Sequence, residues 1–157
     1  MSSSNTATHT EQELSRETRH SEVDVLALVC NWCTYTAADL AGVSRMDYPA
    51  QVRLIRFMCT GMIDMRYILG CFLEGADGVF IGGCHPGDCH YLSGNLKARV
   101  RIQGLRPVLE SVGIPPERLR LEWVGASEGK KLQEDLTGFT REIQDLGPLP
   151  TKGMNLL

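Results

Sequence analysis

Four apolar runs with β-type composition recur along this chain, and a segment with helical periodicity follows each of them. The runs span residues 23–30, 51–59, 77–84 and 118–126. Behind the second and fourth runs, apolar residues repeat at helical spacing from Met65 to Phe72 and from Leu132 to Leu146. Alternating strands and helices predict an α/β fold, because each helix crosses back over the sheet to reach the next parallel strand. We expect a small flavodoxin-like, mostly parallel four-stranded sheet with helices on both faces, and the strand order is left open.

The ends and interruptions of two helices are marked by particular residues. Pro107 lies within the long helical segment that ends at Gly113. We expect it to kink or divide that segment, because proline lacks the backbone donor that an interior helical position needs. Ser127 is the expected N-cap of the last helix, and Gly147 with Pro148 marks its expected end.

The length of 157 residues corresponds to about one domain. We expect a disordered polar lead-in over residues 1–21, one domain over 22–148 and a tail over 149–157. The lead-in lacks the apolar segment of a secretory signal, and no run approaches the roughly 20 apolar residues of a membrane-spanning helix. The net charge of −3 argues against nucleic acid and against an anionic membrane as partners. We therefore expect a cytoplasmic protein that binds neither.

Cysteine is the residue type whose placement points to a function. All six cysteines lie within residues 30–89. In a chain without an export signal, cysteines bind metal or carry out redox chemistry more often than they form disulfides. Five of them end one of the first three strands or follow it closely, namely Cys30, Cys33, Cys59, Cys84 and Cys89. Because the carboxyl ends of parallel strands share one edge of a sheet, we expect these five thiols to converge there.

Several other residues are expected to surround the thiols. They are Trp32, Gly83, His85, Gly87 and His90. The glycines allow the backbone to approach a bound group closely, the histidines can donate hydrogen bonds or face a partner, and the tryptophan can shield the site. Cys33 and Cys89 are expected near helix N-termini, where the helix dipole favours thiolate. Cys71 lies on a helix beside Ile68 and Phe72, and we expect it to be a packing residue.

Four interpretations of the five thiols remain open at this stage. An iron–sulfur cluster is favoured, because it needs four thiolates and tolerates long gaps between them. Structural zinc usually uses two short cysteine pairs, and only Cys30 and Cys33 form such a pair here. The same pair could serve a thiol–disulfide oxidoreductase, and unligated core thiols are the fourth possibility. If four of the five ligate a cluster, the preferred set is Cys33, Cys59, Cys84 and Cys89, because Cys30 lies partly within its strand.

Several motifs resemble one known family, the delta subunit of methyl-viologen-reducing hydrogenase. The motifs are CNWCTYTAADLAGVSR (30–45), RFMCTGMID (56–64), GVFIGGCHPGDCHYLSGN (78–95) and LEWVGASEG (121–129). The resemblance extends from Val23 to Pro148 and implies a [2Fe-2S] cluster held by four of the five motif cysteines. Cys71 lies outside the motif pattern.

The resemblance also implies a role. Members of this family relay electrons from a [NiFe]-hydrogenase, or sometimes a formate dehydrogenase, to the flavin-bearing subunit of heterodisulfide reductase, where flavin-based electron bifurcation takes place. The chain is thus expected to be a non-catalytic electron-transfer subunit of an oxidoreductase complex. A thiol–disulfide oxidoreductase using Cys30 and Cys33, or a zinc-stabilised interaction module, is the alternative from the residues alone.

Overall fold

The computed structural model describes residues 23–150 of the chain. The predicted lead-in over residues 1–21 lies outside the described residues, as do residues 151–157 of the predicted tail. In chain order the elements are β1 (Val25–Cys30), α2 (Thr34–Val43), β2 (Val52–Phe57), the 3₁₀ turn η1 (Thr60–Met62), α3 (Met65–Leu73), β3 (Gly78–Gly83), α4 (Gly94–Ser111), the 3₁₀ turn η2 (Pro116–Arg118), β4 (Leu119–Trp123) and α5 (Gly129–Leu146).

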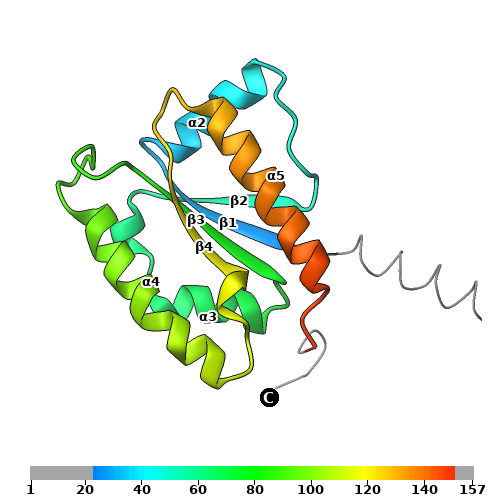
Figure 1. Ribbon diagram of the computed structural model, residues 1–157. Coiled ribbons are helices and arrows are strands. Elements are labelled where there is room, and N and C mark those ends of the chain that lie inside the picture. The colour runs from blue at the N-terminus through cyan, green and yellow to red at the C-terminus, as the bar shows by residue number, and fades with distance from the viewer. Residues whose placement is uncertain (1–22, 151–157) are drawn as a thin grey trace, which may run out of the picture.

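The four strands form one sheet in the order β2-β1-β3-β4, and every neighbouring pair is parallel (Figure 1). The predicted α/β class is therefore confirmed, with a wholly parallel sheet. The chain leaves β1 toward β2 on one side and later returns to place β3 on the other side. The carboxyl ends of β1 and β3 thus flank the topological switch point, which is where open parallel sheets form a crevice.

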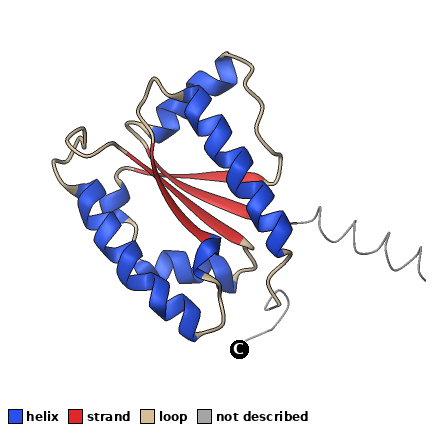
Figure 2. Ribbon diagram, in the orientation of Figure 1, coloured by secondary structure: helices blue, strands red, loops and turns tan. Residues whose placement is uncertain are grey.

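Helices cover both faces of the sheet, α3 and α4 on one and α2 and α5 on the other (Figures 1 and 2). Each face has its own apolar core. The core under α3 and α4 contains Ile68, Phe72, Ile102, Leu105 and Leu109, and the core under α2 and α5 contains Ala37, Leu132, Leu136, Phe139 and Ile143. Full burial of a side chain such as Leu or Phe contributes roughly 1.5–3 kcal/mol. The fold therefore has two apolar layers that do not include the cysteines of the carboxyl edge.

The burial of each strand follows from its place in the sheet. All six residues of β3 are buried, because β3 is a central strand with helices on both faces. β2 is an edge strand, and most of its residues are exposed or half-buried. None of the helices within residues 23–150 is both long and apolar enough to cross a membrane.

Two helix boundaries differ from the sequence prediction. α4 runs from Gly94 to Ser111 without a break, so Pro107 does not divide it. Pro107 and Gln103 both lie on the exposed side of α4. Proline has no N–H to bond the carbonyl of Gln103, but water can reach that carbonyl, so the helix continues. At the start of α5 the N-cap residue is Glu128 rather than Ser127. The end of α5 at Gly147 is as predicted, and Gly147 has the positive φ that is typical of helix ends.

Candidate metal centre

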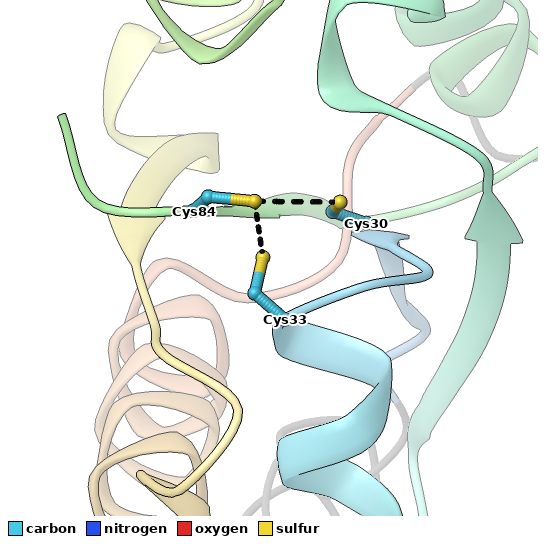
Figure 3. Close-up of side chains that lie close together, drawn as sticks. All are labelled: Cys30, Cys33 and Cys84. Atoms are coloured by element: carbon cyan, nitrogen blue, oxygen red, sulfur yellow. Dashed lines mark hydrogen bonds between the residues drawn. The ribbon is translucent and has the colours of Figure 1, made fainter. Parts of the chain in front are cut away.

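Cys30, Cys33 and Cys84 form a buried group at the switch point between β1 and β3. Cys30 is the last residue of β1, Cys33 is the N-cap residue of α2, and Cys84 directly follows β3. The Sγ of Cys84 lies 2.8 Å from the Sγ of Cys33 and 3.7 Å from the Sγ of Cys30. Figure 3 shows the three sulfurs facing one another, although the residues come from separate parts of the chain. All three sulfurs lie within 4.8 Å of one another, which is close enough to share a metal group.

Cys59 and Cys89 form a second buried group, with their sulfurs 3.9 Å apart. Cys59 follows β2 by two residues, and its Sγ accepts a hydrogen bond from the N–H of Gly61. Burial raises the pKa of the Cys59 thiol, and the nearby charges of Cys89 and Cys30 raise it further. Because Cys30 acts on Cys59, the pair and the triad lie within electrostatic reach of each other. The five thiols are therefore arranged as a group of three beside a group of two.

The triad favours one negative charge in the absence of a cation. Hydrogen bonds from Cys33 and Cys84 lower the pKa of the Cys30 thiol to about 2. The same contact with Cys30 raises the pKa of Cys33 to about 11, and hydrogen bonds to Cys30 and Cys33 raise that of Cys84. The N-terminus of α2 is expected to lower the pKa of Cys33, but the neighbouring Cys30 thiolate raises it by more. Further thiolates become favourable only when a positive charge neutralises the group.

The start of α4 acts on Cys89. Burial alone would raise the pKa of the Cys89 thiol, but backbone N–H groups of Asn95, Tyr91 and Gly94 and the hydrogen bond with Cys59 together lower it. This is the thiolate-favouring helix N-terminus that the sequence predicts, because unsatisfied N–H groups and the helix dipole both point toward the sulfur.

The loop between Cys84 and Cys89 is shaped by a turn and fixed by an amide. The N–H of Asp88 donates to the carbonyl of His85 at 3.0 Å, and Gly87 between them has a φ of 95°. Only glycine adopts that φ readily, so the turn explains Gly87, and a Cβ there would meet no atom within 4 Å. The buried Asn95 side chain donates to the carbonyls of Cys84 and His85 at 2.9 and 2.8 Å. These contacts fix the direction in which the loop leaves β3.

Two close approaches position the sulfurs, and neither was predicted from the sequence. A Cβ at Gly94 would lie 2.2 Å from the Sγ of Cys59, so only glycine lets α4 begin there. The fully buried Thr34 lies beside Cys33, with its Oγ1 3.6 Å from that Sγ. The Ser-Gly-Asn run at 93–95 indicates a tight helix start. It does not reveal the contact between Gly94 and Cys59, because these residues are more than thirty positions apart in the sequence. Gly83 lies against Trp123 and Thr60, and so makes room for side chains rather than for sulfur.

Three rings on the thiol-bearing segments contact one another. Trp32 stacks on His90 with ring centroids 4.1 Å apart, and the Trp32 indole N–H donates to the Tyr91 hydroxyl at 3.3 Å. His90 also meets Tyr91 edge-on. The stack joins the segment that carries Cys33 to the segment that carries Cys89, so Trp32 and His90 hold two thiol-bearing loops together.

His85 faces Glu128 at the start of α5. Its Nε2 lies 2.7 Å from Oε2 of Glu128, which also accepts a hydrogen bond from the N–H of Gly125. The N–H of Gly125, followed by His85, lowers the pKa of Glu128. His85 therefore links the loop after β3 to the loop after β4, and its side chain contacts a carboxylate rather than a thiol.

Cys71 is separate from the five. It lies on α3, is half-buried and packs against the core under α3 and α4. Burial raises the pKa of its thiol, which favours the uncharged form. These surroundings agree with the packing role that the sequence predicts.

The donor set fits an iron–sulfur group. Five buried sulfurs in two adjacent groups offer soft thiolate ligands, and such ligands select zinc, copper(I) or iron–sulfur clusters over oxygen-preferring cations. Four of Cys30, Cys33, Cys59, Cys84 and Cys89 would suffice. Among the described residues, the hydrogen-bond partners of the triad are other thiols, Thr34 and backbone groups. None of these partners is a cation that would neutralise the thiolates.

Comparison with known proteins agrees with this chemistry. Residues 25–147 match the family described as methyl-viologen-reducing hydrogenase, delta subunit. The iron-sulfur subunit of the F420-non-reducing hydrogenase vhc of Methanococcus voltae is 50% identical over 131 residues, which is 83% of this chain and 91% of that protein. The iron-sulfur subunit of the F420-non-reducing hydrogenase of Archaeoglobus profundus is 48% identical over 127 residues, covering 81% of this chain and 93% of that protein.

A third relative has a different organisation. It is a subunit of the ferredoxin:CoB-CoM heterodisulfide reductase of Methanosarcina mazei, and it is 41% identical over 125 residues, which is 80% of this chain but only 16% of that protein. In that protein, a domain like this one is part of a much longer polypeptide.

Proposed function

Because this chain belongs to the family of methyl-viologen-reducing hydrogenase delta subunits, we propose that it is an electron-transfer subunit that carries one [2Fe-2S] cluster. Its relatives are named as subunits of hydrogenase and heterodisulfide reductase complexes. The observation that carries the proposal is the meeting of five buried thiols from three crossover units at one edge of the sheet. When bound, such a cluster accepts and donates one electron without local proton chemistry.

The grouping of the thiols supports a division of the ligands. Cys59 and Cys89 would hold one iron, and two of Cys30, Cys33 and Cys84 the other, with Cys84 included because its sulfur is close to both others. The fifth thiol would then belong to the triad. Cys30 remains the predicted spare, so Cys30→Ser should keep the cluster and Cys33→Ser should lose it. Iron content of the two variants tests this choice, and the reverse result would make Cys33 the spare.

We further propose that the partners are those of the family. The donor would be a hydrogenase or formate dehydrogenase subunit, and the acceptor the flavin-bearing subunit of a heterodisulfide reductase, where flavin-based bifurcation would take place. The Methanosarcina mazei relative supports the acceptor, because there a domain like this one lies within a heterodisulfide reductase polypeptide. Six reduced cysteines fit a cytoplasmic location.

The surroundings of the thiols give less support to the alternatives. An attacking thiol must be accessible, whereas Cys30 and Cys33 are only 1% and 6% exposed, and the sulfur closest to Cys33 is that of Cys84. Structural zinc usually replaces a missing core, and this fold has two apolar cores of its own.

The deciding experiment is iron and acid-labile sulfide analysis of protein purified without oxygen, together with electron paramagnetic resonance of the reduced form. We expect about two irons and two sulfides per chain and visible absorbance that bleaches on reduction. A colourless protein with one zinc, or a metal-free protein with a reactive dithiol, would contradict the proposal.

A further inference from the structure

A groove with a volume of about 420 Å³ opens on the surface directly above Cys59. It is lined by Met58, Cys59, Gly61, Met62, Tyr91, Gly94 and Lys97. The lining comes from the segment after β2 and from the start of α4, so the groove lies between the two elements that hold the Cys59–Cys89 pair. Cys59 is the cysteine that lines this groove, so a group bound in the groove would contact Cys59 rather than Cys30, Cys33, Cys84 or Cys89.

The walls of the groove are apolar and exposed. The side chains of Met58 and Met62 are 47% and 59% exposed, and Tyr91 on the opposite wall is also exposed. Methionine is flexible and polarisable, and it is frequent on surfaces that bind other proteins. Two further exposed apolar side chains, Leu96 and Val100, line a second depression that shares Lys97 with the groove. Contiguous exposed apolar surface of this kind marks an interaction site.

Cations border this surface. Lys97 lines both the groove and the second depression, Arg101 lines the second, and the first acidic residue of α4 is Glu110. Within residues 23–150 Lys97 has no ion-pair partner, and Arg101 donates to the carbonyls of Gly61 and Ile63. Cations in the first turns of a helix oppose its dipole. They are better accommodated when an external negative charge faces them, and the chain as a whole is not basic, with a net charge of −3.

We propose that this groove is the docking site for an acidic segment of the electron-accepting partner, which inserts an apolar side chain between Met58, Met62 and Tyr91 and places a carboxylate against Lys97. The inference rests on the proposed function, since the partner is the heterodisulfide reductase subunit proposed above. An apolar anchor in a pocket gives affinity, whereas the charged rim speeds association and sets orientation. Insertion there would exclude water beside Cys59 and bring the partner's redox group near the thiol site.

The test is a binding measurement between the cluster-loaded full chain and the purified flavin-bearing subunit of heterodisulfide reductase from the same host, without oxygen, at 50 and 300 mM KCl. We expect Met62→Asp to weaken binding at least thirty-fold, because it places a charge in an apolar pocket. Lys97→Glu should weaken binding at least ten-fold at 50 mM KCl and reduce the dependence of affinity on salt.

Two variants on other surfaces serve as matched controls. Val43→Asp changes an apolar residue at the end of α2 that is 85% exposed, and Arg141→Glu changes an exposed cation on α5. Both should bind as the wild type does. All variants must keep wild-type iron and sulfide, which shows that they are folded and loaded.

The outcomes separate the docking surface from the proposed function. If the groove variants bind as tightly as the controls, or if loaded wild-type protein does not bind the reductase subunit, the docking proposal is overturned. It is also overturned if the groove variants lose only binding to hydrogenase subunits. Failure of the proposed function would instead appear earlier, as wild-type protein without iron and sulfide.

Discussion

The two ends of the sheet both bury ionisable groups, but they satisfy them differently. At the amino end, the fully buried Asp77 accepts hydrogen bonds from the N–H groups of Asp24 and Leu149, at 2.8 and 2.7 Å. The buried Arg118 donates to the carbonyls of Asp77 and Gly147, at 2.9 and 2.7 Å. These bonds tie the start of β1, the start of β3 and the residues after α5 to one another.

At the carboxyl end, the ionisable groups have mainly one another as partners. The sulfurs of Cys33 and Cys84 are 2.8 Å apart, those of Cys59 and Cys89 are 3.9 Å apart, and among the described residues no cationic side chain donates a hydrogen bond to them. Buried polar groups are normally satisfied within the protein. The amino end thus satisfies its buried groups from within the chain, apart from the Nε of Arg118, whereas the carboxyl end needs a cation to balance its thiolates. That difference separates a structural network from a functional site.

The largest expected effect is the loss of iron when Cys84 is replaced, compared with no loss when Cys71, outside the site, is replaced. Cys84→Ser should abolish iron binding, because serine replaces the sulfur that lies between two others with a poorer ligand for iron. Cys71→Ser should leave iron content unchanged, because Cys71 packs in the core under α3 and α4. Iron analysis and electron paramagnetic resonance of both variants measure this. Retained iron in Cys84→Ser, with loss in Cys71→Ser, would overturn the site.

At the other end of the sheet the expected loss is one of stability. Asp77→Ala removes the acceptor of the buried Leu149 N–H and of the half-buried Asp24 N–H, and each unsatisfied buried donor costs about 1–3 kcal/mol. We expect the free energy of unfolding to fall by about 2–5 kcal/mol, with iron per folded chain unchanged. Urea unfolding followed by circular dichroism gives the first value. Asp77→Asn keeps one acceptor oxygen and should lose less; an equal or greater loss would contradict this account.

A smaller effect is expected at the close approach between α4 and Cys59. Gly94→Ala would place a Cβ 2.2 Å from the Cys59 sulfur and should lower both iron content and stability, the latter by about 1–3 kcal/mol. Gly104→Ala on the same helix is the control, because its Cβ would meet nothing within 4 Å. It should leave iron content unchanged and raise stability slightly. If the two variants have the same iron content, Gly94 does not position the sulfur.

The smallest effect concerns pH and the contact of His85 with Glu128. The pKa of Glu128 is lowered from 4.5, first by the N–H of Gly125 and then by His85. Its carboxylate therefore stabilises the fold above about pH 4.5, and this contribution is lost as pH falls through the lowered pKa. We expect Glu128→Gln to lower the urea midpoint at pH 6.5 and to approach the wild type at pH 3.5, measured on iron-free protein. A constant difference across that range would exclude titration of Glu128 as the cause.

Much of the fold could be predicted because it depends on local patterns. The alternation of apolar runs with helical spacing is a property of neighbouring residues, and it predicts parallel strands joined by helices. One departure is local, because Pro107 is tolerated on the solvent side of α4. The other is not, because the side chain of the N-cap residue Glu128 binds both Gly125 nearby and His85, which is 43 residues away in the chain. The strand order β2-β1-β3-β4 depends instead on which helix packs on which face.

The candidate site divides in the same way. The sequence by itself determined that Cys30, Cys59 and Cys84 lie at or just beyond strand ends, and parallel topology then brings them to one edge. Only the tertiary structure decided that the thiols form a group of three and a group of two, that Gly94 gives Cys59 its room, and that Asn95 holds the loop after β3. The physical reason is that strand and helix patterns repeat over a few residues, whereas these contacts join segments separated by whole crossovers and form only when the helices have packed.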